Sequence, residues 1–98
     1  MTINKTKNGS SLTIILEGRL DTTTSPEVEK EINSSLNGID ELVFDLAKLE
    51  YISSAGLRVL LHAKKVMSSQ GKMIVCGANE TVNEVFEITG FSDILDLK

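Results

Sequence analysis

Two apolar runs separated by an amphipathic helical pattern constrain the fold of this chain more than any other feature. The runs are Leu42–Leu46 and Lys72–Cys76. Between them, residues 54–70 carry apolar side chains at helical spacing, with a serine pair at the start and Gly71 at the end. Neighbouring parallel strands need a crossover connection of a dozen or more residues, usually a helix. The sequence therefore predicts a strand-helix-strand unit in a parallel or mixed sheet.

The remaining segments complete an α/β pattern. Leu12–Leu16 is rich in β-branched and apolar residues and follows a hairpin signal at Asn8–Gly9, which predicts an early strand. A first helix is expected up to Asn37, capped by Thr24 or Ser25 and with Glu27 placed as in a capping box with Thr24. A third helix is expected from Asn79 to Gly90, and Ile94–Leu97 is expected to form a short final strand or a tail.

The apolar run Leu42–Leu46 is interrupted only by Asp45, and near-continuous apolar sequence is typical of a strand covered by helices on both faces. We expect the Asp45 carboxylate to lie near the strand end or to have a partner. The lone Cys76 lies in the second apolar run and cannot form an internal disulfide, so it is interpreted as a small core residue in a reduced compartment.

Length and charge restrict the class of protein. Ninety-eight residues suffice for one domain, spanning residues 1–98. The net charge of −4 and the scarcity of aromatic residues argue against nucleic acid as the main partner. The polar start and the lack of a long apolar stretch indicate neither a signal peptide nor a membrane span, so a cytoplasmic protein is expected. The acidic charge and the few aromatic residues favour a monomer.

A serine pair, Ser53 and Ser54, stands where the central helical pattern begins. A serine hydroxyl at this place can accept a hydrogen bond from an unpaired backbone N–H of the first turn. The positive end of the helix dipole also tolerates a phosphate there. Two interpretations remain open: the serines only cap the helix, or one of them is a modification site.

The residues do not favour an enzyme or a metal site. The single histidine, His62, falls on the polar face of the central helical pattern, a poor position for a base acting on Ser53 or Ser54. The Gly-x-Ser-x-Gly elbow and the Walker and dinucleotide motifs are missing. One histidine and one cysteine do not form a metal cluster, so no catalytic residue, metal or cofactor is expected.

The stretch Tyr51–Leu61 resembles the loop-to-helix signature of the bacterial anti-sigma factor antagonists of the STAS domain family. Further segments follow in the family's order: Gly18–Asp21, Leu42–Leu46, Gly71–Cys76 and Val85–Phe91. The similarity runs from about Leu12 to about Leu97. It implies an α/β fold of STAS type, with a mixed sheet of four to five strands covered by about three to four helices.

By position, the resemblance makes Ser54 the phosphorylated serine of the family, with Ser53 a less favoured acceptor. Three departures from the family pattern are present: Ser53 replaces the usual acidic residue, Ala55 replaces Ser or Thr, and Arg58 replaces the second glycine. Arg58 is interpreted either as a partner for a phosphate on Ser54 or as an ordinary solvated cation. Asp21 is interpreted either as a turn residue or as part of the partner surface.

The resemblance implies an anti-sigma factor antagonist. Its unphosphorylated form would sequester an anti-sigma factor that is also a serine kinase of the histidine-kinase-like ATPase type, and a PP2C-like phosphatase would reset it. The expected partner-binding residues are Asp21, Thr22, Ser53, Ser54, Ala55, Gly56, Leu57 and Arg58. Two alternatives stay open: a module of the same fold that binds partners constitutively, and a module that binds a nucleotide phosphate at the helix start.

Overall fold

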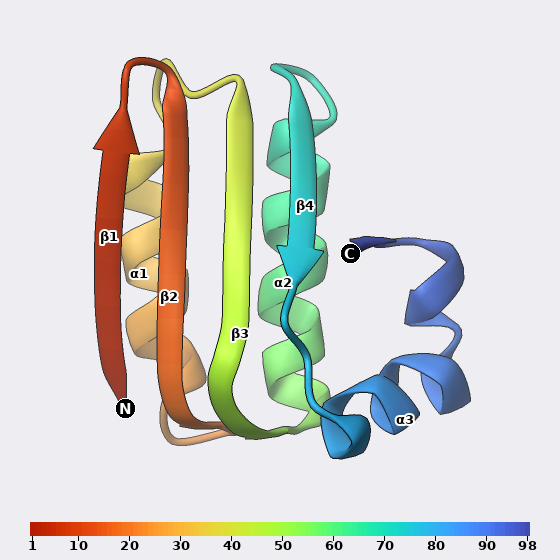
Figure 1. Ribbon diagram of the computed structural model, residues 1–98. Helices are drawn as coiled ribbons and strands as arrows, with labels where there is room; N and C mark the ends of the chain where they lie inside the picture. The colour runs from red at the N-terminus through yellow and green to blue at the C-terminus, as the bar shows by residue number, and fades with distance from the viewer.

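The computed structural model describes residues 1–98 as a five-stranded mixed sheet with helices packed against it (Figure 1). The strands are β1 (Thr2–Asn8), β2 (Ser11–Leu20), β3 (Glu41–Ile52), β4 (Lys72–Cys76) and β5 (Asp96–Leu97). The helices are α1 (Ser25–Ser35), α2 (Ser54–Met67), α3 (Glu80–Thr89) and a short 3₁₀ helix, η1 (Phe91–Asp93). The predicted fold class is confirmed.

The strands lie side by side in chain order, β1-β2-β3-β4-β5. β1 and β2 form the predicted hairpin, whose two-residue loop is Gly9–Ser10. All other neighbours are parallel. The two apolar runs pair as predicted, with Leu42 opposite Met73 and Phe44 opposite Val75, and α2 is the connection between them.

Helices α1 and α2 cover the same face of the sheet (Figure 1). This follows from strand order, because crossovers of one hand that advance in one direction place their helices on one side. Along β3, Leu42 and Phe44 are buried, whereas Val43 and Asp45 point to the other face and are only half-buried. The expectation that helices cover both faces of this strand is therefore wrong.

The open face also holds Asp45 and Cys76, which are paired across β3 and β4. The Asp45 carboxylate finds its partner locally, accepting a hydrogen bond from the backbone N–H of Ala47 at 3.0 Å. Cys76 is half-buried, and burial, together with the nearby Asp45 carboxylate, raises the pKa of its thiol. The interpretation of Cys76 as a core residue is wrong, because it lies on the face that no helix covers.

The core lies between the sheet and its helices and contains 23 buried apolar side chains in one cluster. Phe44 of β3 and Phe86 of α3 are its largest fully buried members. Up to Leu16 and Leu46, β2 and β3 contribute alternate residues to this cluster, which specifies their register there. Beyond this point the register shifts twice, between Ile15 and Glu17 and between Gly18 and Arg19, and it ends with Leu20 opposite Ile52. That register holds the loops at the strand ends in place.

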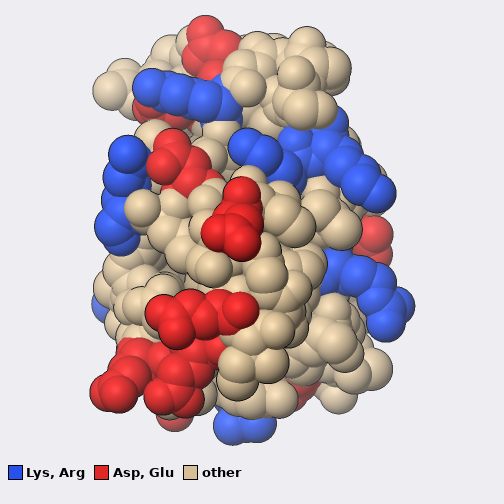
Figure 2. Space-filling model, turned by 90° about the vertical axis from the view of Figure 1, so that its right-hand side faces the viewer, with Lys and Arg blue, Asp and Glu red and all other residues tan.

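Surface charge is divided between the later helices. Figure 2 views the side of the molecule on which α3 lies, and acidic side chains gather over its lower part, where Figure 1 places α3. The sequence of α3 contains three glutamates and no basic residue. Helix α2 contains Arg58, Lys64 and Lys65 and no acidic residue. No helix is both long enough and apolar enough to cross a lipid bilayer.

Candidate functional site

Two loops meet at the end of the sheet where β2 and β3 finish. Leu20 pairs with Ile52 in parallel register, and the backbone N–H of Ser53 donates to the carbonyl of Leu20 at 2.9 Å. The carboxyl ends of neighbouring parallel strands share one edge of a sheet. Residues 21–24 and 53–58, called here the two-loop edge, are therefore neighbours although they lie far apart in the sequence.

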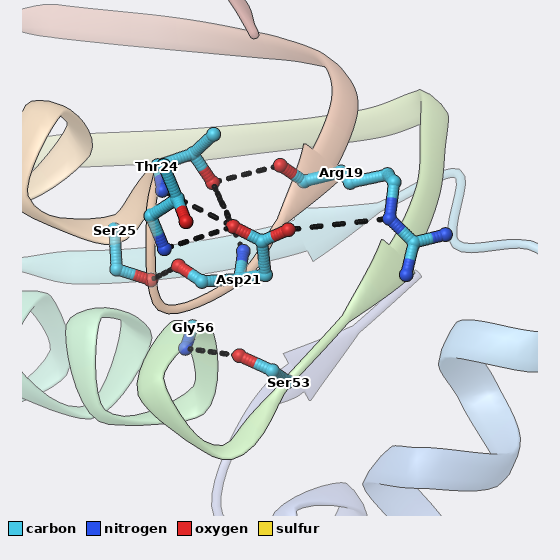
Figure 3. A network of polar contacts seen from close by, with 7 residues as sticks. Arg19, Asp21, Thr24, Ser25, Ser53 and Gly56 are labelled. Atoms are coloured by element: carbon cyan, nitrogen blue, oxygen red, sulfur yellow. Dashed lines mark hydrogen bonds and ion pairs between the residues drawn. The ribbon is translucent and has the colours of Figure 1, made fainter.

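The two serines at the start of α2 have different structural positions. Ser53 occupies the N-cap position with extended backbone, φ −100° and ψ 178°, and its Oγ accepts a hydrogen bond from the N–H of Gly56 at 3.4 Å (Figure 3). Ser54 is the first helical residue and its side chain is exposed. The predicted serine cap is confirmed for Ser53, and the Ser54 hydroxyl is left without a capping role.

Asp21 organises the other loop. Its Oδ1 accepts hydrogen bonds from the backbone N–H groups of Thr23 at 3.0 Å and Thr24 at 3.2 Å (Figure 3). The backbone hydrogen bond from Thr24 is the main reason why the pKa of Asp21 lies below its ordinary value. Oδ2 faces the Arg19 guanidinium at 4.0 Å, and the side chain is 33% exposed. Asp21 thus turns the chain with one oxygen and offers the other at the surface.

Helix α1 begins differently from its prediction. Thr24 occupies the N-cap position, but its side chain makes no capping bond. Its Oγ1 instead donates to the carbonyl of Arg19 at 2.8 Å and accepts from the N–H of Asp21 at 2.9 Å. The predicted capping box of Thr24 and Glu27 is therefore wrong, because the loop itself uses the threonine hydroxyl.

Gly56 allows the first turn of α2 to lie against the strand ends. A Cβ on this residue would stand 2.8 Å from the Ile52 Cγ1 and Leu20 Cγ atoms and 3.0 Å from the Leu20 carbonyl oxygen. These contacts are shorter than van der Waals distances. The glycine of the signature thus has a packing reason, which no local sequence pattern states.

The predicted partner-binding residues differ in exposure. Gly56 and Leu57 are buried, so they position the loop and offer little surface themselves. Thr22, Ser54 and Arg58 are exposed, and Asp21, Ser53 and Ala55 are half-buried. The structure brings all of these residues to the two-loop edge or directly beneath it.

Sequence reasoning missed a contact that links the two strand ends. The Arg19 guanidinium lies over the ring of Tyr51, 4.6 Å from its centroid, and the same side chain faces Asp21. Arg19 and Tyr51 are opposite each other in the β2–β3 register. The resemblance of Gly18–Asp21 to a family segment draws attention to the segment that contains Arg19. Only the β2–β3 register identifies Tyr51 as the partner of Arg19.

The arrangement offers a hydroxyl and a surface, without an assembled set of reacting groups. His62 lies on α2 away from the helix start, where its Nε2 is 3.0 Å from the Asn33 Oδ1 on α1. No group of three or more His, Cys, Asp or Glu side chains is placed to hold a metal ion. The exposed Ser54 hydroxyl is accessible to modification, and the exposed side chains of Thr22 and Arg58 can contact another molecule.

The chain is similar to a known domain family and to several bacterial proteins. The model of the STAS domain family matches residues 2–98. The BtrV protein of Bordetella bronchiseptica is 38% identical over 96 residues, covering 96% of this chain and 83% of BtrV. The anti-sigma-B factor antagonist of Listeria monocytogenes is 32% identical over 97 residues, covering 96% of this chain and 84% of that protein.

A solved structure has the same fold. The Bacillus cell fate determinant SpoIIAA in its phosphorylated form superposes with a TM-score of 0.77 at 16% identity, covering 99% of this chain and 91% of SpoIIAA. At this identity the likeness concerns the fold alone.

Proposed function

The chain belongs to the STAS domain family and is a homologue of its anti-sigma factor antagonists, and we propose that it is itself an antagonist switched by phosphorylation. In this proposal, the unphosphorylated two-loop edge binds an anti-sigma factor that is also a serine kinase of the histidine-kinase-like ATPase type. The bound anti-sigma factor then releases its sigma factor. Phosphorylation of Ser54 by that kinase ends binding, and a PP2C-like phosphatase restores the first state.

The position of Ser54 carries this proposal. The residue is exposed, it begins α2, and it lies beside the loop that Asp21 organises. A phosphate at a helix N-terminus is favoured by the helix dipole, so α2 stays folded after modification. Ser53 is the poorer acceptor, because it is half-buried and its Oγ holds the helix cap.

The size of the effect is sufficient for a switch. A phosphate adds about −1.5 to −2 charges at pH 7. The Arg58 guanidinium can balance at most one of these charges, and charge left unpaired in an interface costs roughly 3–5 kcal/mol. Since each 1.4 kcal/mol changes affinity about tenfold, such a cost weakens binding by roughly two to three and a half orders of magnitude. Release therefore needs no refolding of the antagonist.

The relatives support the same reading. The Listeria monocytogenes homologue is an anti-sigma-B factor antagonist by name, and SpoIIAA, which shares the fold, exists in a phosphorylated form.

Phosphorylation is tested with the histidine-kinase-like ATPase encoded nearest to this gene, hereafter the neighbouring kinase. The protein is incubated with this kinase and ATP and analysed by mass spectrometry after proteolysis. We expect one phosphate on Ser54, none in Ser54→Ala, and an unchanged amount in Ser53→Asn, because asparagine caps as well as serine and cannot be phosphorylated. Phosphate only on other residues, or none in the wild type, contradicts the proposal.

Binding is tested by titrating the ADP-bound neighbouring kinase with the unmodified protein in a calorimeter. We expect Ser54→Ala to bind like the wild type and Ser54→Asp to bind at least tenfold more weakly. If Ser54→Asp and the phosphorylated protein both bind as tightly as the unmodified wild type, the protein is instead a constitutive binding module.

A further inference from the structure

A groove leads away from the two-loop edge between α1 and α2. Its volume is about 400 Å³, and its lining includes Thr22 and Ala55, which also belong to the two-loop edge. The apolar part of the lining consists of Ala55, Val59 and Leu61. The groove and the Ser54 loop are therefore parts of one continuous surface.

The α2 wall of this groove is basic although the protein as a whole is acidic. Arg58, His62 and Lys65 line it at helical spacing, whereas the one acidic residue in the lining is Glu29 of α1. Neither Arg58 nor Lys65 takes part in an ion pair within the molecule. His62 is held toward α1 by Asn33. The groove thus presents two unpaired cations in a chain whose net charge is −4.

We infer that this groove is a second contact for the anti-sigma factor and binds an acidic segment of it, while Ser54 lies in the first contact. The inference rests on the proposed function. Charge complementarity selects an acidic segment, because Arg58 and Lys65 are free to pair carboxylates. The half-buried Ala55 and Leu61 can contact an apolar side chain of the same segment. A volume of about 400 Å³ takes a few side chains and leaves the rest of the segment on the surface.

The same geometry explains how a phosphate on Ser54 reaches this second contact. Ser54 and Arg58 are four residues apart on α2, and side chains with this spacing are neighbours on a helix surface. A phosphate on Ser54 pairs with the Arg58 guanidinium, which binds phosphate oxygens through two parallel N–H donors. Phosphorylation therefore withdraws Arg58 from the groove and adds negative charge at its mouth. The phosphate on Ser54 then occupies Arg58 in place of a carboxylate of the partner.

The docking step is tested by charge reversal far from Ser54. Lys65→Glu removes a groove cation three helical turns from the serine, and Lys7→Glu is the matched control, because Lys7 is exposed on β1 and lines neither the groove nor the two-loop edge. In calorimetry with the ADP-bound neighbouring kinase, we expect Lys65→Glu to lower affinity about tenfold and Lys7→Glu less than twofold. Equal effects of the two substitutions overturn the inference.

The switch and the groove can fail separately. If Ser54→Asp abolishes binding and Lys65→Glu does not weaken it, the groove is excluded and the switch stands. If Lys65→Glu weakens binding and Ser54→Asp does not, the groove stands and the switch is excluded. Calorimetry with ATP and GTP is a further test. If either nucleotide binds with micromolar affinity and Lys65→Glu abolishes that binding, the groove is a nucleotide site and the inference is overturned.

Competition for Arg58 has its own readout. The phosphorylated protein is titrated by ³¹P NMR, and we expect the second pKa of the phosphoserine to lie below its ordinary value of about 6. In Arg58→Gln the pKa should return toward that value, since the guanidinium favours the dianion. Lys65→Gln, which removes a cation further along α2, should leave it unchanged. The same pKa in the wild type and in Arg58→Gln overturns the competition step.

Discussion

The two ends of the parallel strands carry similar polar residues and use them differently. At the end where β3 and β4 begin, Ser11 donates to Glu41 at 2.9 Å, Lys72 pairs with Glu41 at 3.0 Å, and Ser10 donates to Asp40 at 2.9 Å. Backbone bonds from Asp40 to Ser10 and from Lys72 to Asp40 close this paired edge. Here the charged side chains have their partners within the molecule.

At the two-loop edge, several polar groups remain available. Ser54, Thr22 and Arg58 are exposed, and the Oδ2 of Asp21 has only a 4.0 Å contact with Arg19. The hydrogen bonds present, such as those to the Asp21 Oδ1, hold loops in shape and leave these groups free. The two edges have similar residue types but differ in how many of their polar groups are paired within the molecule. Substitutions at the paired edge should change stability, and those at the two-loop edge should change binding.

Gly71→Ala should have the largest effect and should act on stability. A Cβ at this position would stand 1.9 Å from the carbonyl oxygen of Asp40, so backbone at the paired edge must move. We expect a loss of about 3 kcal/mol in the free energy of unfolding, measured by urea denaturation at pH 7. The control is Ser69→Ala, which removes only a local bond to the Val66 carbonyl. Undiminished stability of Gly71→Ala would show that this edge is looser than its contacts indicate.

Gly56→Ala should lower the free energy of unfolding less than Gly71→Ala does, and it should weaken partner binding more. The nearest atoms to the added Cβ are side-chain atoms of Ile52 and Leu20 at 2.8 Å, which can shift, with the Leu20 carbonyl oxygen at 3.0 Å. We expect a loss of about 1–2 kcal/mol in unfolding free energy. Because α2 must tilt at its start, affinity for the neighbouring kinase should fall more than in Gly71→Ala, compared at equal concentrations of folded protein. If Gly71→Ala instead weakens binding more than Gly56→Ala, the proposed difference between the two edges is wrong.

Ser53→Ala and Ser54→Ala separate a structural serine from an exposed one. Ser53→Ala removes the cap of α2 and should lower the free energy of unfolding by roughly 0.5–1 kcal/mol, because the hydrogen bond to Gly56 is long. Ser53→Asn should restore the wild-type value. Ser54→Ala should change the unfolding free energy by less than about 0.5 kcal/mol. A larger loss in Ser54→Ala than in Ser53→Ala would assign the cap to the other serine.

Acid should lower the free energy of unfolding slightly, because each edge has a carboxylate whose pKa is lowered in the folded protein. Lys72 and Ser11 lower the pKa of Glu41 from its ordinary 4.5, and the Thr24 backbone lowers the pKa of Asp21 from 3.8. A lowered folded-state pKa stabilises the fold above the ordinary value, and this contribution is lost as the pH falls through the folded value. Glu41→Gln should therefore reduce the loss of stability below pH 4.5, and Asp21→Asn the loss below pH 3.8.

The check is urea unfolding of the wild type and both variants at several pH values between neutral and strongly acidic. Acid profiles of Glu41→Gln and Asp21→Asn that follow the wild type throughout would show that these pairs form equally well in the unfolded chain.

Several parts of the fold and site follow from local sequence because their causes are local. The pairing of the two apolar runs follows from their composition and from the helix-length segment between them, and the structure has Leu42 opposite Met73. The cap at Ser53 follows from the place of the serine before an apolar-periodic segment. The resemblance of Tyr51–Leu61 to a family signature then predicts that Ser54 is the modified serine.

Other features could not be predicted, since they depend on residues that the fold brings together. The open face that holds Cys76 follows from the strand order, which no single strand contains. The use of the Thr24 hydroxyl by its loop depends on the Arg19 carbonyl, and the contact of Arg19 with Tyr51 depends on β2–β3 register.

The sequence by itself determined which segments become strands and helices and placed a hydroxyl at the start of the central helix, because periodicity, capping and turn chemistry act over a few neighbouring residues. Only the tertiary structure decided that Asp21 lies beside Ser53, that Gly56 must be a glycine, and that α1 and α2 enclose a basic groove. The physical reason is that strand register and helix packing join residues about thirty positions apart, and the side chains on both partners fix those contacts together.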